Sequence, residues 1–206
     1  MPDELNLLAT RIRKCRVCRD TPKSGKQPLP HEPRPVLQVS SAARIMIAGQ
    51  APGTRVHASG KPFTDPSGDR LRDWMGIGED VFYDPEKLAI VPMGFCFPGL
   101  DAKGSDLPPR TECAPLWRED LMQVMPQVAL VLAIGMYAQN WHMAKQRKST
   151  LTETVRNWRQ YHVMKPVSVI PMPHPSWRNT GWLKKNPWFE AELLPVLKAD
   201  VKALVS

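Results

Sequence analysis

Four cysteines give the first chemical signal in this 206-residue chain. Cys15 and Cys18 form a Cys-x-x-Cys turn near the N-terminus, whereas Cys96 and Cys113 lie far along the chain and well apart from each other. In a reducing cytoplasm a disulfide is disfavoured, so a tight pair with two further cysteines indicates a metal site or a redox role.

Three readings of these cysteines can be compared. A redox turn with two buried thiols is one, but Cys15 and Cys18 follow a short helical segment and do not open a helix after a strand, as thioredoxin-like motifs do. A zinc ribbon would need a second close pair, and Cys96 and Cys113 are too widely spaced for that. Four thiolates can enclose an iron–sulfur cube, because each corner iron takes one cysteine.

The other residues suited to chemistry occur in short segments that follow apolar runs. One run ends in Gly49-Gln50-Ala51-Pro52-Gly53, and another ends in Pro173-His174-Pro175-Ser176. Glycines without a side chain let a ligand approach the backbone, and prolines on both sides of a histidine restrict its backbone. Both segments are therefore candidate binding or catalytic positions.

The elements that must position these residues alternate between strands and helices. Short Val- and Ile-rich runs predict buried strands at 44–49, 88–93, 128–134 and 167–171. The intervening segments predict helices at 68–76, 111–125, 136–147 and 150–158. This alternation predicts a three-layer α/β/α fold with a central four-stranded parallel sheet, in which ligands bind at the carboxyl ends of the strands.

The rest of the chain predicts one domain over 1–206. An opening helix is expected at 3–14, a Pro-rich surface loop at 21–38 and a C-terminal helix at 187–204. An apolar content of 42% excludes a disordered chain, and no apolar run approaches the roughly 18 residues of a membrane helix. No secretory signal is seen, so a cytoplasmic protein is expected. The net charge of +8 favours a polyanionic partner.

Read in order, the motifs resemble the iron–sulfur, family 4-like branch of the uracil-DNA glycosylase superfamily. The resemblance rests on Gly49 to Gly53, Gly60-Lys61-Pro62-Phe63, His174-Pro175-Ser176, the four cysteines and the helix start from Glu112 to Leu116. It implies a monomeric base-excision repair enzyme that hydrolyses the N-glycosidic bond of uracil in single- or double-stranded DNA and leaves an abasic site. It also implies a structural 4Fe-4S cluster held by the cysteines.

The resemblance assigns roles to individual residues. His174 would face the uracil oxygen. The general base is expected from proximity to Phe63 and not from the resemblance: Asp65 is the first choice and Asp69 the second, while Gln50 could orient water but not act as a base. The expected substrate-binding residues are Gly49, Ala51, Pro52, Gly53, Phe63 and Ser176. The expected DNA-binding residues are Trp177, Arg178, Asn179, Lys184 and Lys185. Asp65 precedes Pro66, so a turn or helix-cap role is an alternative for it.

The chain departs from the family pattern in ways that leave a second function open. Pro92 occupies the position of the Asn that reads the uracil edge, and Val56-His57 replaces an acidic pair. Asp65 follows Phe63-Thr64 where the family has a glycine after Phe, and 97–112 lacks the His of a related branch that bonds covalently to abasic DNA. The alternative is a catalytically silent protein that binds lesions or abasic sites. A redox protein is disfavoured because the pocket motifs are retained.

Overall fold

The computed structural model describes residues 2–23 and 25–206. Met1 and Ser24 lie outside the described residues. Both belong to the expected domain, and Ser24 also belongs to the expected Pro-rich loop. The centre of the fold is a parallel sheet with the strand order β2-β1-β3-β4. Its strands are β1 (Ile45–Ala48), β2 (Leu88–Ile90), β3 (Leu130–Ile134) and β4 (Ser168–Met172). The predicted four-stranded parallel sheet is confirmed, although β2 ends before its expected limit at residue 93.

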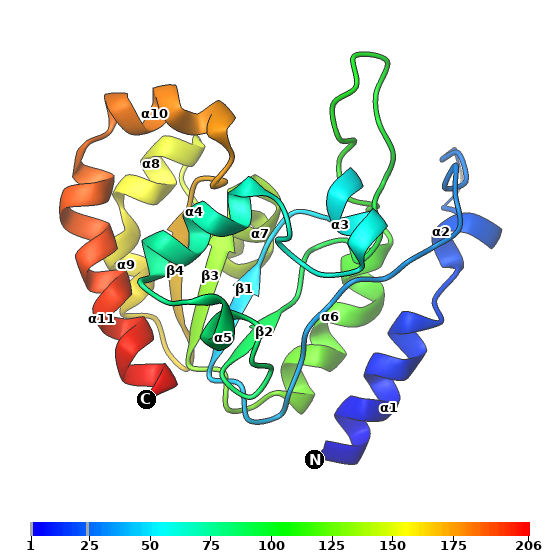
Figure 1. The fold of residues 1–206 in the computed structure, drawn as a ribbon, viewed down its shortest axis with the longest axis horizontal. Coiled ribbons are helices and arrows are strands. Elements are labelled where there is room, and N and C mark those ends of the chain that lie inside the picture. Colours follow the sequence, from blue (N-terminus) through cyan, green and yellow to red (C-terminus); the bar gives the residue numbers. More distant parts are fainter. Residues whose placement is uncertain (1, 24) are drawn as a thin grey trace.

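Helices cover both faces of this sheet, which is why β1, β2 and β3 are buried throughout. Alternate residues of a strand point to opposite faces, so Met46 and Ala48 belong to one hydrophobic core and Ile45 and Ile47 to the other. The long helices are α1 (Pro2–Arg13), α4 (Pro66–Met75), α6 (Cys113–Val124), α7 (Gly135–Met143) and α11 (Leu194–Val205). The first core contains side chains of α1, α6 and α7, and the second contains those of α4 and α11. Figure 1 shows α1 and α6 on one side and α4 and α11 on the other, so the three-layer arrangement is confirmed.

Several short helices escaped the sequence prediction because one or two turns leave no periodic pattern to detect. They are α2 (Val17–Asp20), α3 (Thr54–Ser59), α5 (Glu79–Phe82), α10 (Thr180–Lys185) and the 3-10 turns Ala144–Gln146 and Trp177–Asn179. The helix expected at 150–158 is divided into α8 (Leu151–Arg156) and α9 (Trp158–His162). In the segment expected as the last helix, a π-helix (Phe189–Leu193) precedes α11.

The Pro-rich segment that follows α2 does not run wholly over the surface as expected. Leu29, Val36 and Leu37 are buried, and Gln38 exchanges two backbone hydrogen bonds with Ile90 of the edge strand β2. This short antiparallel bridge covers part of an otherwise open sheet edge. The segment therefore joins the cysteine turn to the sheet.

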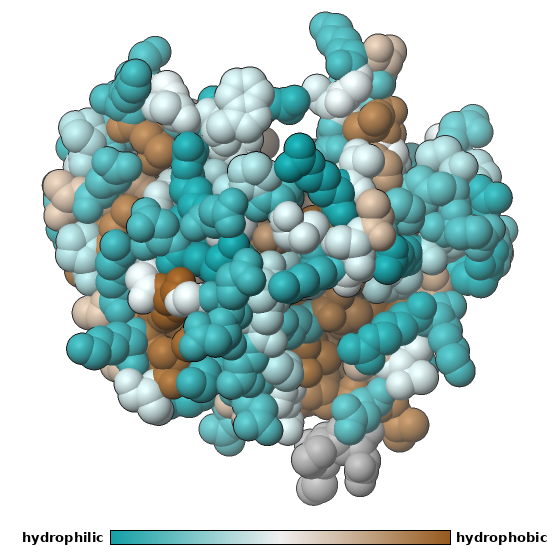
Figure 2. Space-filling view, viewed as in Figure 1, coloured by the Kyte–Doolittle hydropathy of each residue, from teal (hydrophilic) through white to brown (hydrophobic). Residues whose placement is uncertain are grey.

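The outer surface is mainly hydrophilic on the face drawn in Figure 2, with hydrophobic surface gathered near α6 and α1. Leu7 of α1 and Leu116 of α6 are among the exposed apolar side chains. None of the helices formed by the described residues has the length and apolar character needed to cross a membrane.

A buried guanidinium anchors the end of β2. Arg118 of α6 is 1% exposed, and its Nη1 donates to the carbonyl oxygens of Val91 (2.8 Å) and Pro92 (3.3 Å). Its Nη2 lies 2.7 Å from Nε2 of His142, and no carboxylate of the described residues forms an ion pair with it. Burial and the Arg118 charge lower the pKa of His142 to about 3, so His142 is neutral and accepts from Arg118.

The neutral His142 makes stability depend on pH. Its folded-state pKa lies below its ordinary value, so below that ordinary value the unfolded chain binds a proton that the folded chain does not. We expect the free energy of unfolding to fall between pH 7 and pH 5, with this residue contributing at most about 1.4 kcal/mol per pH unit. Urea unfolding of wild type and His142→Asn, whose amide oxygen can still accept from Arg118, should give a shallower slope for the variant. Identical slopes would exclude His142 as the source.

Candidate active site and cysteine pocket

A pocket of about 100 Å³ opens where the carboxyl ends of β1, β2 and β4 meet. Eight residues expected at the site line it: Gly49, Gln50, Ala51, Pro52, Gly53, Phe63, Asp65 and His174. Pro92, Val56 and Ser67 also contribute to its wall. Residues far apart in the sequence are thus brought together, as expected for the ligand-binding edge of a parallel sheet.

Phe63 adopts a strained backbone at this pocket. Its φ is 52°, in the left-handed region, which costs a residue other than glycine about 1–3 kcal/mol. The Tyr83 hydroxyl donates to the carbonyl oxygens of Pro62 (3.0 Å) and Phe63 (3.2 Å). Gly68 of α4 lets this carbonyl approach, because a Cβ there would lie 1.9 Å from the Phe63 oxygen. The Phe63 ring packs edge-on against Phe82, so its position is set by several neighbours.

His174 is held in one tautomer by its own loop. The backbone N–H of Ser176 donates to its Nδ1 at 3.2 Å, so in the neutral ring the proton is on Nε2. The Asn179 amide donates to the His174 carbonyl oxygen at 2.7 Å. Burial lowers the pKa of His174, while the carboxylates of Asp65 and Asp106 act in the opposite direction. The result is a neutral imidazole with an Nε2–H available for donation.

The candidate carboxylates differ in their surroundings. Asp65 lines the pocket, but its Oδ1 accepts from the Ser67 N–H at 2.7 Å and caps the N-terminus of α4. Asp69 is 74% exposed, pairs with Arg72 and does not line the pocket. The Gln50 side chain lines the pocket and makes no hydrogen bond with the described residues. Asp65 therefore fits both the catalytic and the capping interpretation, and Asp69 is outside the site.

Asp106 is a pocket residue that the sequence reasoning missed. It lies on a hairpin between Gly99 and Leu107, and its carboxylate reaches the turn at Gly53. The available signal was the glycine at each bend, since Gly99 (φ 101°) and Gly104 (φ 76°) have backbone angles that favour glycine. Glycines predict that the chain turns there, but they do not predict that the hairpin brings Asp106 next to Gly53.

The segment after His174 forms the rim of the site. Ser176, Arg178 and Asn179 line a wider hollow beside the pocket, and Trp177 is 71% exposed. The Arg178 guanidinium lies 5.9 Å from the Trp177 ring centroid. The two lysines expected to bind DNA, Lys184 and Lys185, are exposed on α10 and do not line these hollows. Figure 1 shows α10 and α3 at the same end of the molecule, opposite both chain termini.

The four cysteines line a second, mostly apolar hollow. Cys15 comes from the turn between α1 and α2, Cys18 from α2, Cys96 from the segment after β2, and Cys113 from the first turn of α6. Burial raises the pKa of Cys18 to about 11 and that of Cys96 to about 12, and it also raises the pKa of Cys113. The Phe95 N–H donates to the Cys113 sulfur at 3.4 Å. A cationic group would favour the thiolates that burial disfavours.

The donor set fits an iron–sulfur cluster, because cysteine sulfurs are its usual ligands and all four line one hollow. In the part of the chain that the structure describes, no three His, Cys, Asp or Glu side chains are grouped so that they could hold a metal ion. Four sulfurs on a single zinc would lie only about 3.8 Å apart, as Zn–S bonds of about 2.3 Å in a tetrahedron require. Four thiols around one hollow match the number of corner irons in a cubane cluster, each of which takes one cysteine.

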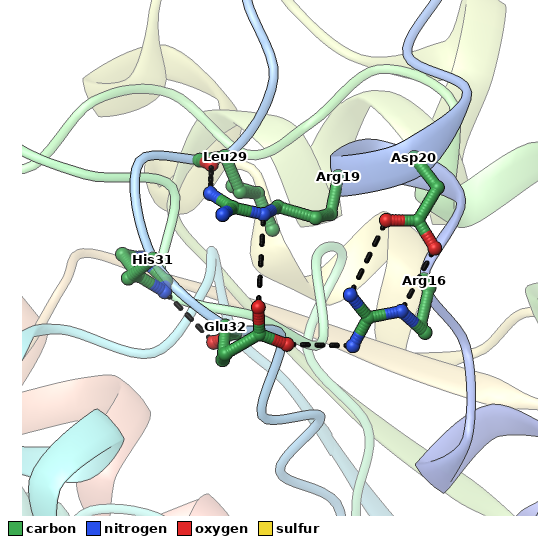
Figure 3. Close-up of polar contacts among 6 residues, drawn as sticks. All are labelled: Arg16, Arg19, Asp20, Leu29, His31 and Glu32. Carbon is green, nitrogen blue, oxygen red and sulfur yellow. Dashed lines mark hydrogen bonds and ion pairs between the residues drawn. The ribbon is translucent and has the colours of Figure 1, made fainter.

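Ion pairs join the cysteine turn to the Pro-rich segment (Figure 3). Arg16 lies between Asp20 (2.8 Å) and Glu32 (2.6 Å), and Arg19 donates to the Leu29 carbonyl oxygen and lies 3.8 Å from Glu32. Arg16 lowers the pKa of Glu32. Arg16, Asp20 and Glu32 are exposed, so salt screens their ion pairs, and these pairs contribute little to the stability of the fold.

Comparison with known proteins gives three findings. A sequence model of the uracil DNA glycosylase superfamily matches residues 37–198. A type-4 uracil-DNA glycosylase from Saccharolobus solfataricus is 28% identical over 132 residues, which are 63% of this chain and 56% of that protein. The match thus spans little more than half of that relative. The NMR structure of a candidate uracil DNA glycosylase from Methanosarcina acetivorans aligns with a TM-score of 0.48 and 12% identity, over 79% of this chain and 94% of that one.

Because the Phe63 backbone packs closely against Gly68 of α4, we expect one methyl group added at residue 68 to lower the stability of the fold. In Gly68→Ala the new Cβ would meet the Phe63 carbonyl, so we expect a loss of about 1–3 kcal/mol and a fall in Tm of several degrees. Gly181→Ala is the matched control, because nothing lies within 4 Å of its Cβ position in α10. Its Tm should stay the same or rise slightly. Equal Tm values for the two variants in thermal unfolding would contradict the expected contact.

Proposed function

Because this chain belongs to the uracil DNA glycosylase superfamily, we propose that it hydrolyses the N-glycosidic bond of uracil in DNA and leaves an abasic site. The observation that carries the proposal is that the Gly49–Gly53 turn, Phe63 and His174 line the same pocket. A pocket with a glycine-rich wall, an aromatic ring and a hydrogen-bond donor has the groups that a flipped base requires.

The base must leave the DNA stack before its glycosidic bond can be reached. We assign Phe63 to stack on the flipped ring, because its ring borders the pocket and its strained backbone is held by Tyr83 and Gly68. Gly49, Ala51, Pro52 and Gly53 would form the close wall beside the nucleotide, with Ser176 at the rim. Strained backbone conformations cluster at functional sites, which supports this assignment.

His174 would stabilise the departing base. As the bond breaks, negative charge grows on the uracil oxygen, and an Nε2–H aimed at it contributes roughly 3 kcal/mol. The Ser176 N–H on Nδ1 supports this role, because it leaves the proton on the nitrogen that faces away from the loop backbone. The lowered pKa of His174 favours the neutral ring as donor.

The uracil edge needs a partner other than the usual Asn. Pro92 lines the pocket without a side-chain amide, and its carbonyl oxygen accepts from Arg118. Gln50 supplies an amide within the pocket that has no hydrogen bond to the described residues. We assign Gln50 to hydrogen-bond the base or the water beside it. The sequence predicts Asp65 as the general base, but one of its oxygens caps α4.

DNA would lie across the rim of the pocket. Trp177 and Arg178 are exposed beside the wider hollows and are suited to enter the base stack and to hold phosphate. Asn179 supports the His174 loop through one hydrogen bond, and Lys184 and Lys185 add positive charge on α10. The formal net charge of +8 agrees with a polyanionic substrate.

We also propose that Cys15, Cys18, Cys96 and Cys113 hold a 4Fe-4S cluster. Such a cluster, when bound, would bring positive iron to the four thiolates and tie together α1, the segment after β2 and α6. The hollow around the cysteines is separate from the pocket of His174, which supports a structural role.

The proposed activity predicts a loss on removing the imidazole. His174→Ala should release uracil at least tenfold more slowly, while its affinity for DNA stays nearly unchanged. The measurement is single-turnover cleavage of labelled single- and double-stranded DNA with one uracil, followed by alkali to break abasic sites. His162→Ala, whose ring pairs with Asp200 away from the pocket, is the matched control and should keep the wild-type rate.

Two results would change the proposal. An unchanged rate in His174→Ala would remove this histidine from the mechanism. Tight binding of uracil-containing DNA by the wild-type protein without any strand breaks would favour the silent lesion-binding alternative.

The cluster proposal predicts a loss of iron. Cys96→Ser should contain much less iron and acid-labile sulfide per chain and should unfold at a lower temperature, because a corner ligand is missing. Ala114→Ser, the next residue after Cys113 in α6, adds a hydroxyl group without removing a thiol and should keep both values. Elemental analysis that finds zinc in place of iron in the wild-type protein would contradict the cluster.

A further inference from the structure

Asp106 and His174 lie where three hollows meet at the carboxyl ends of the strands. The pocket of about 100 Å³ described above is the inner one of the three. Beside it, one wider hollow is bordered by Pro98 and another by Arg55. Asp106 and His174 line all three. With a base in the inner pocket and the sugar–phosphate backbone in the outer hollows, the bond between base and sugar passes this junction.

The hairpin that carries Asp106 is held by its own hydrogen bonds. The Leu107 N–H donates to the Gly99 oxygen (2.9 Å), and the Asp101 N–H donates to the Ser105 oxygen (2.8 Å). The Asp101 carboxylate also accepts from the Ser105 N–H at 2.9 Å. Figure 1 shows this green hairpin standing at the same end of the molecule as α3. The position of Asp106 is thus set by a closed turn.

The Asp106 carboxylate points toward the Gly49–Gly53 turn and is not used in a hydrogen bond with the described residues. Its Oδ2 lies 3.1 Å from the place where a Cβ on Gly53 would be, so the missing side chain at 53 allows the approach. Asp106 makes no side-chain hydrogen bond with the described residues, whereas Asp65 uses one oxygen to cap α4 through Ser67. Asp69 is paired with Arg72 outside the pocket.

The local charges suit a group that accepts a proton. Partial burial raises the pKa of Asp106, and the Asp65 carboxylate acts in the same direction, while Arg178 and His174 oppose it. A carboxylate with a raised pKa is a stronger base than an ordinary one. Asp106 remains exposed at the mouth of the pocket, so water can reach it.

We infer that Asp106 is the catalytic carboxylate that takes the proton from the hydrolytic water. The water oxygen bonds to C1′ while the bond from C1′ to N1 of uracil breaks, and its electron pair leaves with the base. One proton of the water passes to Asp106, and the other stays in the new hydroxyl group on C1′. The uracil anion accepts the Nε2–H hydrogen bond of His174 and later takes a proton from solvent. This inference rests on the proposed glycosylase function.

The test compares variants of the full, cluster-loaded protein in single-turnover cleavage of uracil-containing DNA. Asp106→Asn should be slower by about 100-fold or more, the usual range for loss of a general base, with DNA affinity changed less than about threefold. Added formate should restore at least a tenth of the wild-type rate to Asp106→Ala, because the small carboxylate can enter from solvent. Asp120→Asn removes a carboxylate from the exposed side of α6, outside all three hollows, and should cleave at the wild-type rate.

The outcomes separate the two proposals. Wild-type cleavage with an unchanged rate in Asp106→Asn overturns the role of Asp106 and leaves the glycosylase function standing. Slow cleavage in Asp106→Ala that formate does not restore shows a structural contribution only and also overturns the role. A wild-type protein that cleaves no uracil-containing DNA overturns both proposals.

Discussion

The buried guanidinium of Arg118 fixes the segment that leaves β2, and both hollows are built on that segment. Its bonds to the carbonyl oxygens of Val91 and Pro92 satisfy the backbone at the point where the sheet pairing of β2 stops. Pro92 then lines the candidate active site, and Cys96 lines the cysteine pocket a few residues later. A buried charge without a carboxylate is unfavourable, so carbonyl oxygens and a neutral His142 must supply its hydrogen bonds.

The same chain segment links the cysteine pocket to the candidate active site. Cys96 and Cys113 bound the stretch that contains the hairpin, so any group that joins the two thiols also fixes both ends of this stretch. Asp106 lies between them and reaches the turn at Gly53. The proposed cluster would therefore affect the proposed hydrolysis by holding this loop in place.

Features that depend on short-range patterns could be predicted from the sequence. Buried parallel strands leave continuous apolar runs, and the residues that follow these runs must meet at one edge of the sheet, as Gly49 and His174 do. Asp106 could not be placed in the same way, because its position depends on how a hairpin stands against Gly53. Nor could Arg118, since a basic residue within a helix is normally expected at the surface.

Residues that would touch the substrate and residues that hold them in place differ in how well their polar groups are satisfied. Phe63 has a strained φ, and Asp106 carries a carboxylate without a partner among the described residues. Their supports are fully engaged: Tyr83 bonds the Phe63 carbonyl, and Asp101 closes the hairpin turn. Backbone strain such as that at Phe63 persists only where the surrounding structure over-determines it. The geometry of this site therefore depends on side chains behind the pocket wall, such as Tyr83 and Asp101, which a comparison of pocket residues alone would miss.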